Sequence, residues 1–129
     1  MRLLLDTHIM LRLAEDEINE LPQWVGLATE DAKHTQFVSV VSIWEVSLKH
    51  RLGKLPLPCP LPEWPELLLT LGVTILDLEV APIVAELDPV PNTKDPFDRL
   101  LLTIAQANGM RLLTLDRALL RHPLAWRPA

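Results

Sequence analysis

Four acidic residues stand at expected junctions between strands and helices. They are Asp6 and Asp116, which end apolar runs, and Glu45 and Asp98, which fall in the first turns of expected helices. Carboxylates gathered in one crevice without matching lysines repel one another, and a hard divalent cation removes that penalty. Oxygen ligands suit Mg²⁺ or Mn²⁺, and such a site can activate water against a phosphodiester. The residue types therefore predict metal-dependent hydrolysis of a phosphate ester.

Each of these acids also has a simpler interpretation as a helix cap. Acids at the start of a helix satisfy free backbone N–H groups and suit the positive end of the helix dipole. Glu45 is the most open to this interpretation, because "SIWE" from Ser42 reads as a capping box and Lys49 follows four residues later. For Glu45, capping and metal binding both stay open.

Asp98 fits the capping interpretation less well. The stretch "DPFD" already provides Asp95 as the N-cap and Pro96 at the first helical position, where its missing N–H costs nothing. Helical spacing puts Asp98 at the edge of the apolar face of the helix, and an unpaired charge is costly to bury there. Asp98 is therefore predicted to need a partner or a cation.

The elements that must position these acids alternate between strand and helix patterns. One helix is expected to begin at residue 7, and further helices are expected at residues 19–34, 42–53, 63–72, 79–88, 95–109 and 117–122. Strands are expected at residues 2–5, 37–42, 73–78 and 110–116, with a further one around 124–126. The alternation predicts one α/β domain over residues 1–129, with a central, mostly parallel sheet of four or five strands flanked by helices. Ligands of such sheets bind at the carboxyl ends of the strands, where the four acids are expected.

The composition limits the class of protein. Of 129 residues, 49% are hydrophobic and 22% charged, which predicts a folded globular chain. The single cysteine, Cys59, offers no internal disulfide and no zinc framework, so a reducing, cytosolic compartment is expected. Asp6, His8 and Arg12 interrupt the apolar N-terminus too early for a signal peptide or a membrane span. A net charge of -5 argues against broad electrostatic binding to nucleic acid, except where carboxylates carry cations.

Three stretches of the chain resemble, in their order and spacing, the PIN-domain proteins, and specifically the VapC-type toxins of bacterial toxin–antitoxin pairs. They are "LLLDTHIMLRL", "SIWEVSLKHRLGKL" and "DPFDRLLLTIAQANGMRLLTLD", of which the last is the most specific. The resemblance implies a PIN-like fold and an endoribonuclease that depends on Mg²⁺ or Mn²⁺. It also implies a homodimer and a cognate antitoxin that covers the active site.

The resemblance also assigns roles to individual residues. It implies a catalytic and metal-binding site made of Asp6, Glu45, Asp98 and Asp116. Asp6 and Asp98 are the direct metal ligands that it favours. Its supporting positions are two hydroxyls, Thr7 and Thr114, and the cap Asp95. Many similar sequences carry a histidine where this chain has Thr93, so no proton-transfer role is expected there.

Several basic residues are candidates to contact RNA. Two groups have the charge that phosphate contacts need, namely Lys49, His50, Arg51 and Lys54, and Arg111, Arg117, Arg121 and Arg127. The favoured contacts among them are Lys49, Arg51 and Arg117. A solvated helix face explains them equally well. His8, beside the first acid, is expected either to touch substrate or to pack as a neutral side chain.

The helix expected from Ile43 to Leu52 has two apolar sides. One of them is a stripe of Trp44, Leu48 and Leu52. One side can face the sheet while the other meets a partner chain. The alternative is that the proline-rich loop that follows, or the helix around Trp64, covers it.

Two other functions remain open from the sequence. The first is another Mg²⁺-dependent phosphoryl-transfer domain, which is disfavoured because the four glycines form no phosphate-binding loop. The second is a non-catalytic binding module whose acids are only caps. Carboxylates that lie far apart would favour the binding module, whereas carboxylates gathered in one site would favour a nuclease.

Overall fold

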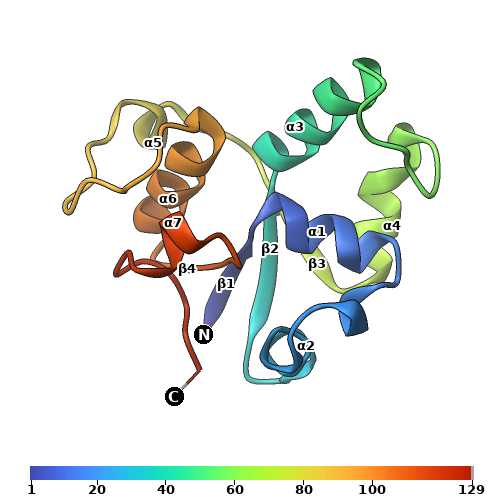
Figure 1. The fold of residues 1–129 in the computed structure, drawn as a ribbon, viewed down its shortest axis with the longest axis horizontal. Coiled ribbons are helices and arrows are strands. Elements are labelled where there is room, and N and C mark those ends of the chain that lie inside the picture. Colours follow the sequence, from blue (N-terminus) through green and yellow to red (C-terminus); the bar gives the residue numbers. More distant parts are fainter. Residues whose placement is uncertain (129) are drawn as a thin grey trace.

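A parallel sheet forms the centre of the molecule. The computed structural model describes residues 1–128, and in this part of the chain the sheet has four strands in the order β3-β2-β1-β4, all parallel (Figure 1). The strands are β1 (Arg2–Leu5), β2 (Thr35–Ser39), β3 (Val73–Leu76) and β4 (Arg111–Leu113). The predicted α/β fold with a parallel sheet is confirmed. Ala129, the last residue of the predicted domain, lies outside the described residues.

Helices cover both faces of this sheet. In Figure 1, α1, α2 and α4 lie on one side of it, and α5, α6 and α7 on the other. The helices are α1 (Thr7–Ala14), α2 (Gln23–Glu30), α3 (Val40–Arg51), α4 (Trp64–Thr70), α5 (Val80–Val84), α6 (Pro96–Asn108) and α7 (Arg117–Leu120), with short 3₁₀ helices η1 (Ile18–Glu20) and η2 (Leu61–Glu63). Within residues 1–128, every helix is too short or too polar to cross a lipid bilayer.

Strand β1 lies between the two halves of the core. Leu3 and Leu5 belong to the cluster under α1, α2 and α4, while Leu4 belongs to the cluster under α6. All three are fully buried, as a central parallel strand with both faces covered requires. Because the strand is held on both faces and both edges, the residue that follows it, Asp6, has a fixed position.

Helix α3 begins earlier than the sequence predicts. The strand expected over residues 37–42 ends at Ser39, whose hydroxyl accepts from the Val41 N–H at 3.0 Å and caps the helix. Val40 and Val41 favour strand because they are β-branched, but the cap at Ser39 overrides that preference. The prediction of Ser42 as N-cap was therefore wrong. Glu45 lies in the second turn of α3 and is not part of a capping box.

The two strands at the edges are shorter than predicted. Strand β3 ends at Leu76 instead of residue 78, and β4 ends at Leu113 instead of Asp116. The expected strand at 124–126 is reduced to one parallel bridge between Leu112 and Ala125. Strand propensity alone overextends these segments, because the chain must leave the sheet to begin the next helix.

Helix α6 agrees with its predicted boundaries. Asp95 caps it by accepting from the Phe97 N–H at 2.8 Å, and Pro96 occupies the first turn. Gly109 ends it with a φ of 64°, a left-handed conformation that glycine adopts without strain. The cap leaves Asp98 free of any helix-starting role.

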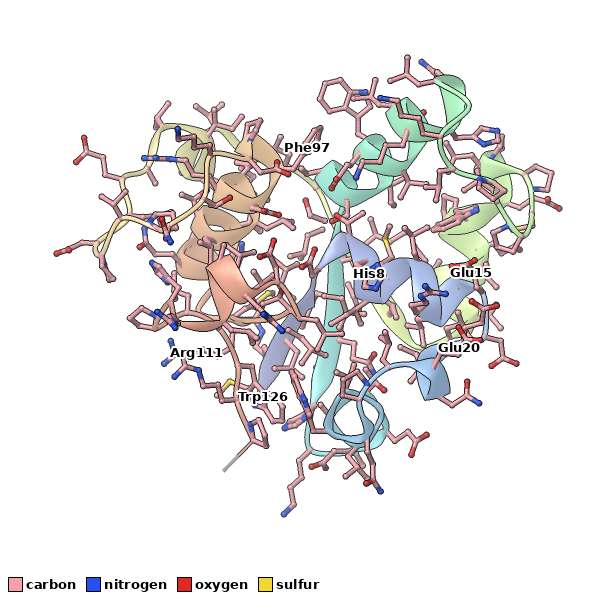
Figure 2. All side chains as sticks on the ribbon, viewed as in Figure 1. His8, Glu15, Glu20, Phe97, Arg111 and Trp126 are labelled. Atoms are coloured by element: carbon pink, nitrogen blue, oxygen red, sulfur yellow. The ribbon has the colours of Figure 1, made fainter. Side chains whose placement is uncertain are left out.

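Aromatic side chains cluster at the other end of the sheet, near the amino ends of the strands. Trp24 on α2 stacks on Trp126 with ring centroids 6.1 Å apart, and His34 meets the Trp126 ring edge-on at 5.4 Å. Figure 2 labels Trp126 near the chain's N-terminal end, on the opposite side of the molecule from Phe97. This aromatic cluster fastens the C-terminal segment to α2.

Candidate active site

A cleft opens at the carboxyl end of the parallel sheet, between α1, α3 and the start of α6. Its volume is about 460 Å³. Figure 2 shows His8 on α1 and Phe97 on α6 on either side of this region. The lining residues include all four predicted acids, and they are Asp6, Thr7, His8, Leu11, Glu45, Lys49, Asp95, Asp98, Leu115 and Asp116. Acids from four distant parts of the chain therefore share one cleft.

Asp6 is the most constrained of these acids. It follows β1 and is only 8% exposed, and its Oδ2 accepts from the Thr114 hydroxyl at 2.5 Å. It stands at the N-cap position of α1, yet its side chain makes no capping hydrogen bond. Burial raises the pKa of Asp6, and the charges of Glu45 and Asp116 raise it further, while the Thr114 bond opposes them. Asp6 is thus a buried carboxylate that the helix does not need as a cap.

Glu45 is buried in the second turn of α3, where both of its oxygens have partners. Oε2 forms a 2.7 Å ion pair with Lys49, and Oε1 lies 2.7 Å from the Thr7 hydroxyl. The Thr7 hydroxyl is also 2.9 Å from the hydroxyl of Ser42. Because a hydroxyl has one proton and a carboxylate only accepts, Thr7 donates to Glu45 and accepts from Ser42. The hydrogen bond to Glu45 raises the pKa of Lys49.

Asp98 projects from the first turn of α6 and is half-buried. Among residues 1–128, its one side-chain hydrogen bond is a long 3.4 Å approach from the Thr93 hydroxyl, which is weak at that distance. Burial raises the pKa of Asp98 to about 7, and the charges of Asp95, Asp6 and Asp116 contribute to this. Asp98 is therefore the least compensated carboxylate in the cleft.

The capping interpretation holds for two acids of the cleft and fails for three. Asp95 caps α6, and Asp116 caps α7 by accepting from the Ala118 N–H at 2.9 Å. Asp6, Glu45 and Asp98 make no such bonds. Asp116 is exposed, lines the cleft, and uses Oδ1 for its cap. Capping therefore does not explain why these acids gather.

The donor set of the cleft fits a hydrated hard cation better than a preformed cage. Among residues 1–128, no group of three or more acidic, histidine or cysteine side chains is arranged to hold a metal ion. Mg²⁺ typically uses one or two carboxylates together with waters and substrate oxygens. Burial, followed by the charges of neighbouring carboxylates, raises the pKa values of Asp6 and Asp98, and a bound cation would oppose both effects. Asp6 and Asp98 supply uncapped carboxylate oxygens, the donor type that such a cation prefers.

The three predicted substrate contacts fall in different places. Lys49 lines the cleft, and Arg117 lines a neighbouring cavity next to Asp116. Arg51, at the end of α3, lines neither cavity, so its contact with RNA stays a prediction. Residues two positions apart on a helix lie on different faces, so Arg51 does not share the face from which Lys49 reaches the cleft.

Two residues of the site went unrecognised in the sequence. Ser42 supports Thr7, and Thr93 approaches Asp98 and accepts from the Asp95 N–H at 3.2 Å. Ser42 was assigned to a cap, which concealed its role. Thr93 had a signal, since it stands two residues before the cap in an ST-turn position.

The chain was compared with known families, curated proteins and solved structures. A family model described as "PIN domain" matches residues 3–123. No curated protein matches the sequence significantly. A crystal structure of VapBC2 from Rickettsia felis, bound to a DNA fragment from their promoter, is similar with a TM-score of 0.61 and 16% identity. The similarity covers 97% of this chain and 96% of that one.

Proposed function

The chain belongs to the PIN-domain family, whose members are generally nucleases, and from this premise we propose that it is a metal-dependent endoribonuclease. It hydrolyses phosphodiester bonds of RNA. The observation that carries the proposal is the meeting of Asp6, Glu45, Asp98 and Asp116 in one cleft at the carboxyl end of the sheet. Three acids of that cleft have no capping role that would explain their position.

The proposed roles follow from the contacts of each side chain. Asp6 and Asp98 hold Mg²⁺ or Mn²⁺, which would activate water and offset the charge of the phosphodiester. Thr114 orients Asp6 through its 2.5 Å hydrogen bond, which also opposes the rise of its pKa by burial. Thr7 orients Glu45 in the same way. Asp116 adds negative charge at the rim, and Asp95 holds the helix start that carries Asp98.

We propose further that the protein is the toxin of a toxin–antitoxin pair and forms a homodimer. The similarity to VapBC2 supports a protein partner, which would be a cognate antitoxin that covers the cleft. The dimer is supported by two exposed apolar side chains, Trp44 on α3, which is 58% exposed, and Leu52 directly after α3, which is 68% exposed. Their exposure argues against cover by the proline-rich loop. A cytosolic location is proposed because the single cysteine suits a reducing compartment.

The decisive experiment is cleavage of defined RNAs by purified protein with Mg²⁺, with Mn²⁺ or with chelator. Cleavage should need the cation and be lost in Asp98→Asn. The matched control is Asp77→Asn, because Asp77 also follows a strand, β3, but lies outside the lining of the cleft. Cleavage that persists in chelator or in a folded Asp98→Asn variant would remove the assignment.

A further inference from the structure

A second cavity lies beside the acidic cleft, between α7 and the segment of residues 89–92 that precedes α6. Its volume is about 570 Å³. We call it the basic groove, and its lining residues are Pro89, Val90, Pro91, Asn92, Arg117, Ala118, Leu120, Arg121 and His122. In Figure 1, α7 lies against α6 on the side of the sheet opposite to α1. The groove therefore belongs to the C-terminal half of the molecule.

Two unpaired cations line this groove. Arg117 and Arg121 are four residues apart along α7 and its C-terminal end, which places them on the same side of the helix. Both are exposed. Among residues 1–128, neither side chain takes part in an ion pair or a hydrogen bond, whereas Arg12 and Lys49 are paired with carboxylates. On a chain with a net charge of -5, two arginines without a carboxylate partner are available to an anionic ligand.

The groove has a fixed width because His122 joins its two walls. His122 is 5% exposed, its Nδ1 accepts from the Leu124 N–H at 3.1 Å, and its Nε2 lies 2.8 Å from the Pro89 carbonyl oxygen. Since Nδ1 accepts, the proton of the neutral ring is on Nε2, which donates to Pro89. The buried ring thus ties the end of α7 to the 89–92 segment.

Both walls of the basic groove continue directly into the acidic cleft. Arg117 follows Asp116, so their Cα atoms are about 3.8 Å apart. On the other wall, Asn92 is followed by Thr93, whose hydroxyl approaches Asp98 and accepts from the Asp95 N–H. The groove and the cleft are therefore neighbours along both of these segments.

We propose that the basic groove binds the sugar–phosphate backbone of single-stranded RNA next to the phosphodiester that lies in the cleft, with Arg117 and Arg121 contacting phosphates. The inference rests on the proposed ribonuclease function. RNA is favoured over an acidic peptide because the groove lies next to the site at which RNA is proposed to be hydrolysed. In addition, guanidinium groups bind phosphate oxygens in a fork geometry. Because the chain as a whole carries a net negative charge, it repels a polyanion, whereas the two arginines of the groove attract one.

The test compares Arg117→Ala/Arg121→Ala with Lys33→Ala/Lys54→Ala, which removes the same charge from exposed positions outside both cavities. Affinity is measured by fluorescence anisotropy of a short labelled RNA of mixed sequence, in an Asp98→Asn background that prevents cleavage. The arginine variant should lose on the order of tenfold in affinity at low salt, because two exposed charge contacts are removed. The magnitude of the slope of log affinity against log salt should fall by about 1.4, because each of the two lost phosphate contacts to a single strand contributes about 0.7.

Further measurements keep the inference separate from the proposed function. In the Asp98 wild-type background, the arginine variant should raise KM by a similar factor and leave kcat unchanged. Arg117→Lys/Arg121→Lys should recover part of the affinity, because the charge remains while the fork is lost. Unchanged RNA affinity in the arginine variant, or an equal loss in the lysine control, overturns the groove even if the protein cleaves RNA. If the wild type binds RNA through the groove without cleaving it, the ribonuclease proposal fails and the groove stands.

Discussion

The two ends of strand β1 are built from opposite kinds of contact. At the carboxyl end, Asp6 is buried near Glu45 and Asp116, and Lys49 is the only lysine or arginine among the cleft residues of the described chain. At the amino end, the Met1 ammonium donates to the Lys33 carbonyl at 2.9 Å, and the aromatic cluster around Trp126 closes the surface nearby. The carboxyl end thus gathers like charges, whereas the amino end has hydrogen-bonded polar groups and packed aromatic rings.

The difference indicates where stability and function are located. Like charges held together cost folding free energy, which apolar and aromatic contacts elsewhere offset. We therefore expect removal of a cleft carboxylate to lower activity and raise stability, and changes at the aromatic end to lower stability and leave activity unchanged. The following predictions test that contrast, from the largest expected effect to the smallest.

Asp6→Asn should lower kcat by roughly 10²-fold or more. Loss of a residue that only supports a metal ligand can lower activity by up to about 10²-fold, and Asp6 is proposed as a ligand itself. The same change should raise the midpoint of thermal unfolding without cation, since it removes a buried charge. RNA cleavage and thermal unfolding are the measurements. A variant that loses both activity and stability would place Asp6 on the structural side of the contrast.

Trp126→Ala should lower the free energy of unfolding by about 2 kcal/mol, less than for a fully buried tryptophan because Trp126 is half-buried. Urea unfolding measures the change. RNA cleavage without denaturant should be unaffected. Leu27→Ala is the control, because Leu27 lies on the same surface but is 60% exposed and should change little. Loss of cleavage in the folded Trp126 variant would contradict the separation of the two ends.

Thr114→Val should lower kcat about tenfold, because it removes the hydroxyl that orients Asp6 and accepts from the Asp116 N–H at 3.0 Å. The Thr114 bond lowers the pKa of Asp6, so its loss raises that pKa further. The acidic limb of the pH–rate profile should therefore move to higher pH. Thr114→Ser retains the hydroxyl and should keep the limb in place. Equal profiles for the valine and serine variants would contradict this role.

Asp98→Asn should stabilise the cation-free protein at pH 8, by on the order of 1 kcal/mol at most, because Asp98 is half-buried and solvent screens its charge. The pKa of Asp98 is raised to about 7 in the folded state, so the folded protein binds more protons than the unfolded chain between about pH 4 and pH 7. The stability of the wild type therefore falls as the pH rises through this range. The stability difference between variant and wild type should be near zero at pH 4 and largest above pH 7. Urea unfolding at several pH values measures it, and a difference independent of pH would contradict the raised pKa.

Local chemistry made some parts of the fold predictable from the sequence. The start of α6 was predicted because Asp95, Pro96 and Gly109 each have a conformational reason for their positions. Strand β1 was predicted because a short apolar run ends at an acid. These signals involve residues close together in the chain.

The errors arose where distant contacts decided the structure. Val40 and Val41 favour strand locally, yet they belong to α3, and this misplaced the cap from Ser39 to Ser42. The meeting of the acids followed from the rule for parallel sheets, but Asp116 as a cap and Glu45 as a buried partner of Thr7 needed coordinates. The stacking of Trp24 on Trp126 had no sequence signal, because those residues are far apart in the chain.

The position of β1 at the centre of the sheet has a consequence for synthesis of the chain. Strand β1, which ends just before Asp6, pairs with β4, and the partner of Asp6, Thr114, lies 108 residues later in the chain. Contacts of such high sequence separation form late, after a large loop has closed. The site cannot assemble until the segment that carries Thr114 and Asp116 has left the ribosome. A nascent chain of the proposed ribonuclease is therefore inactive beside the RNA that encodes it.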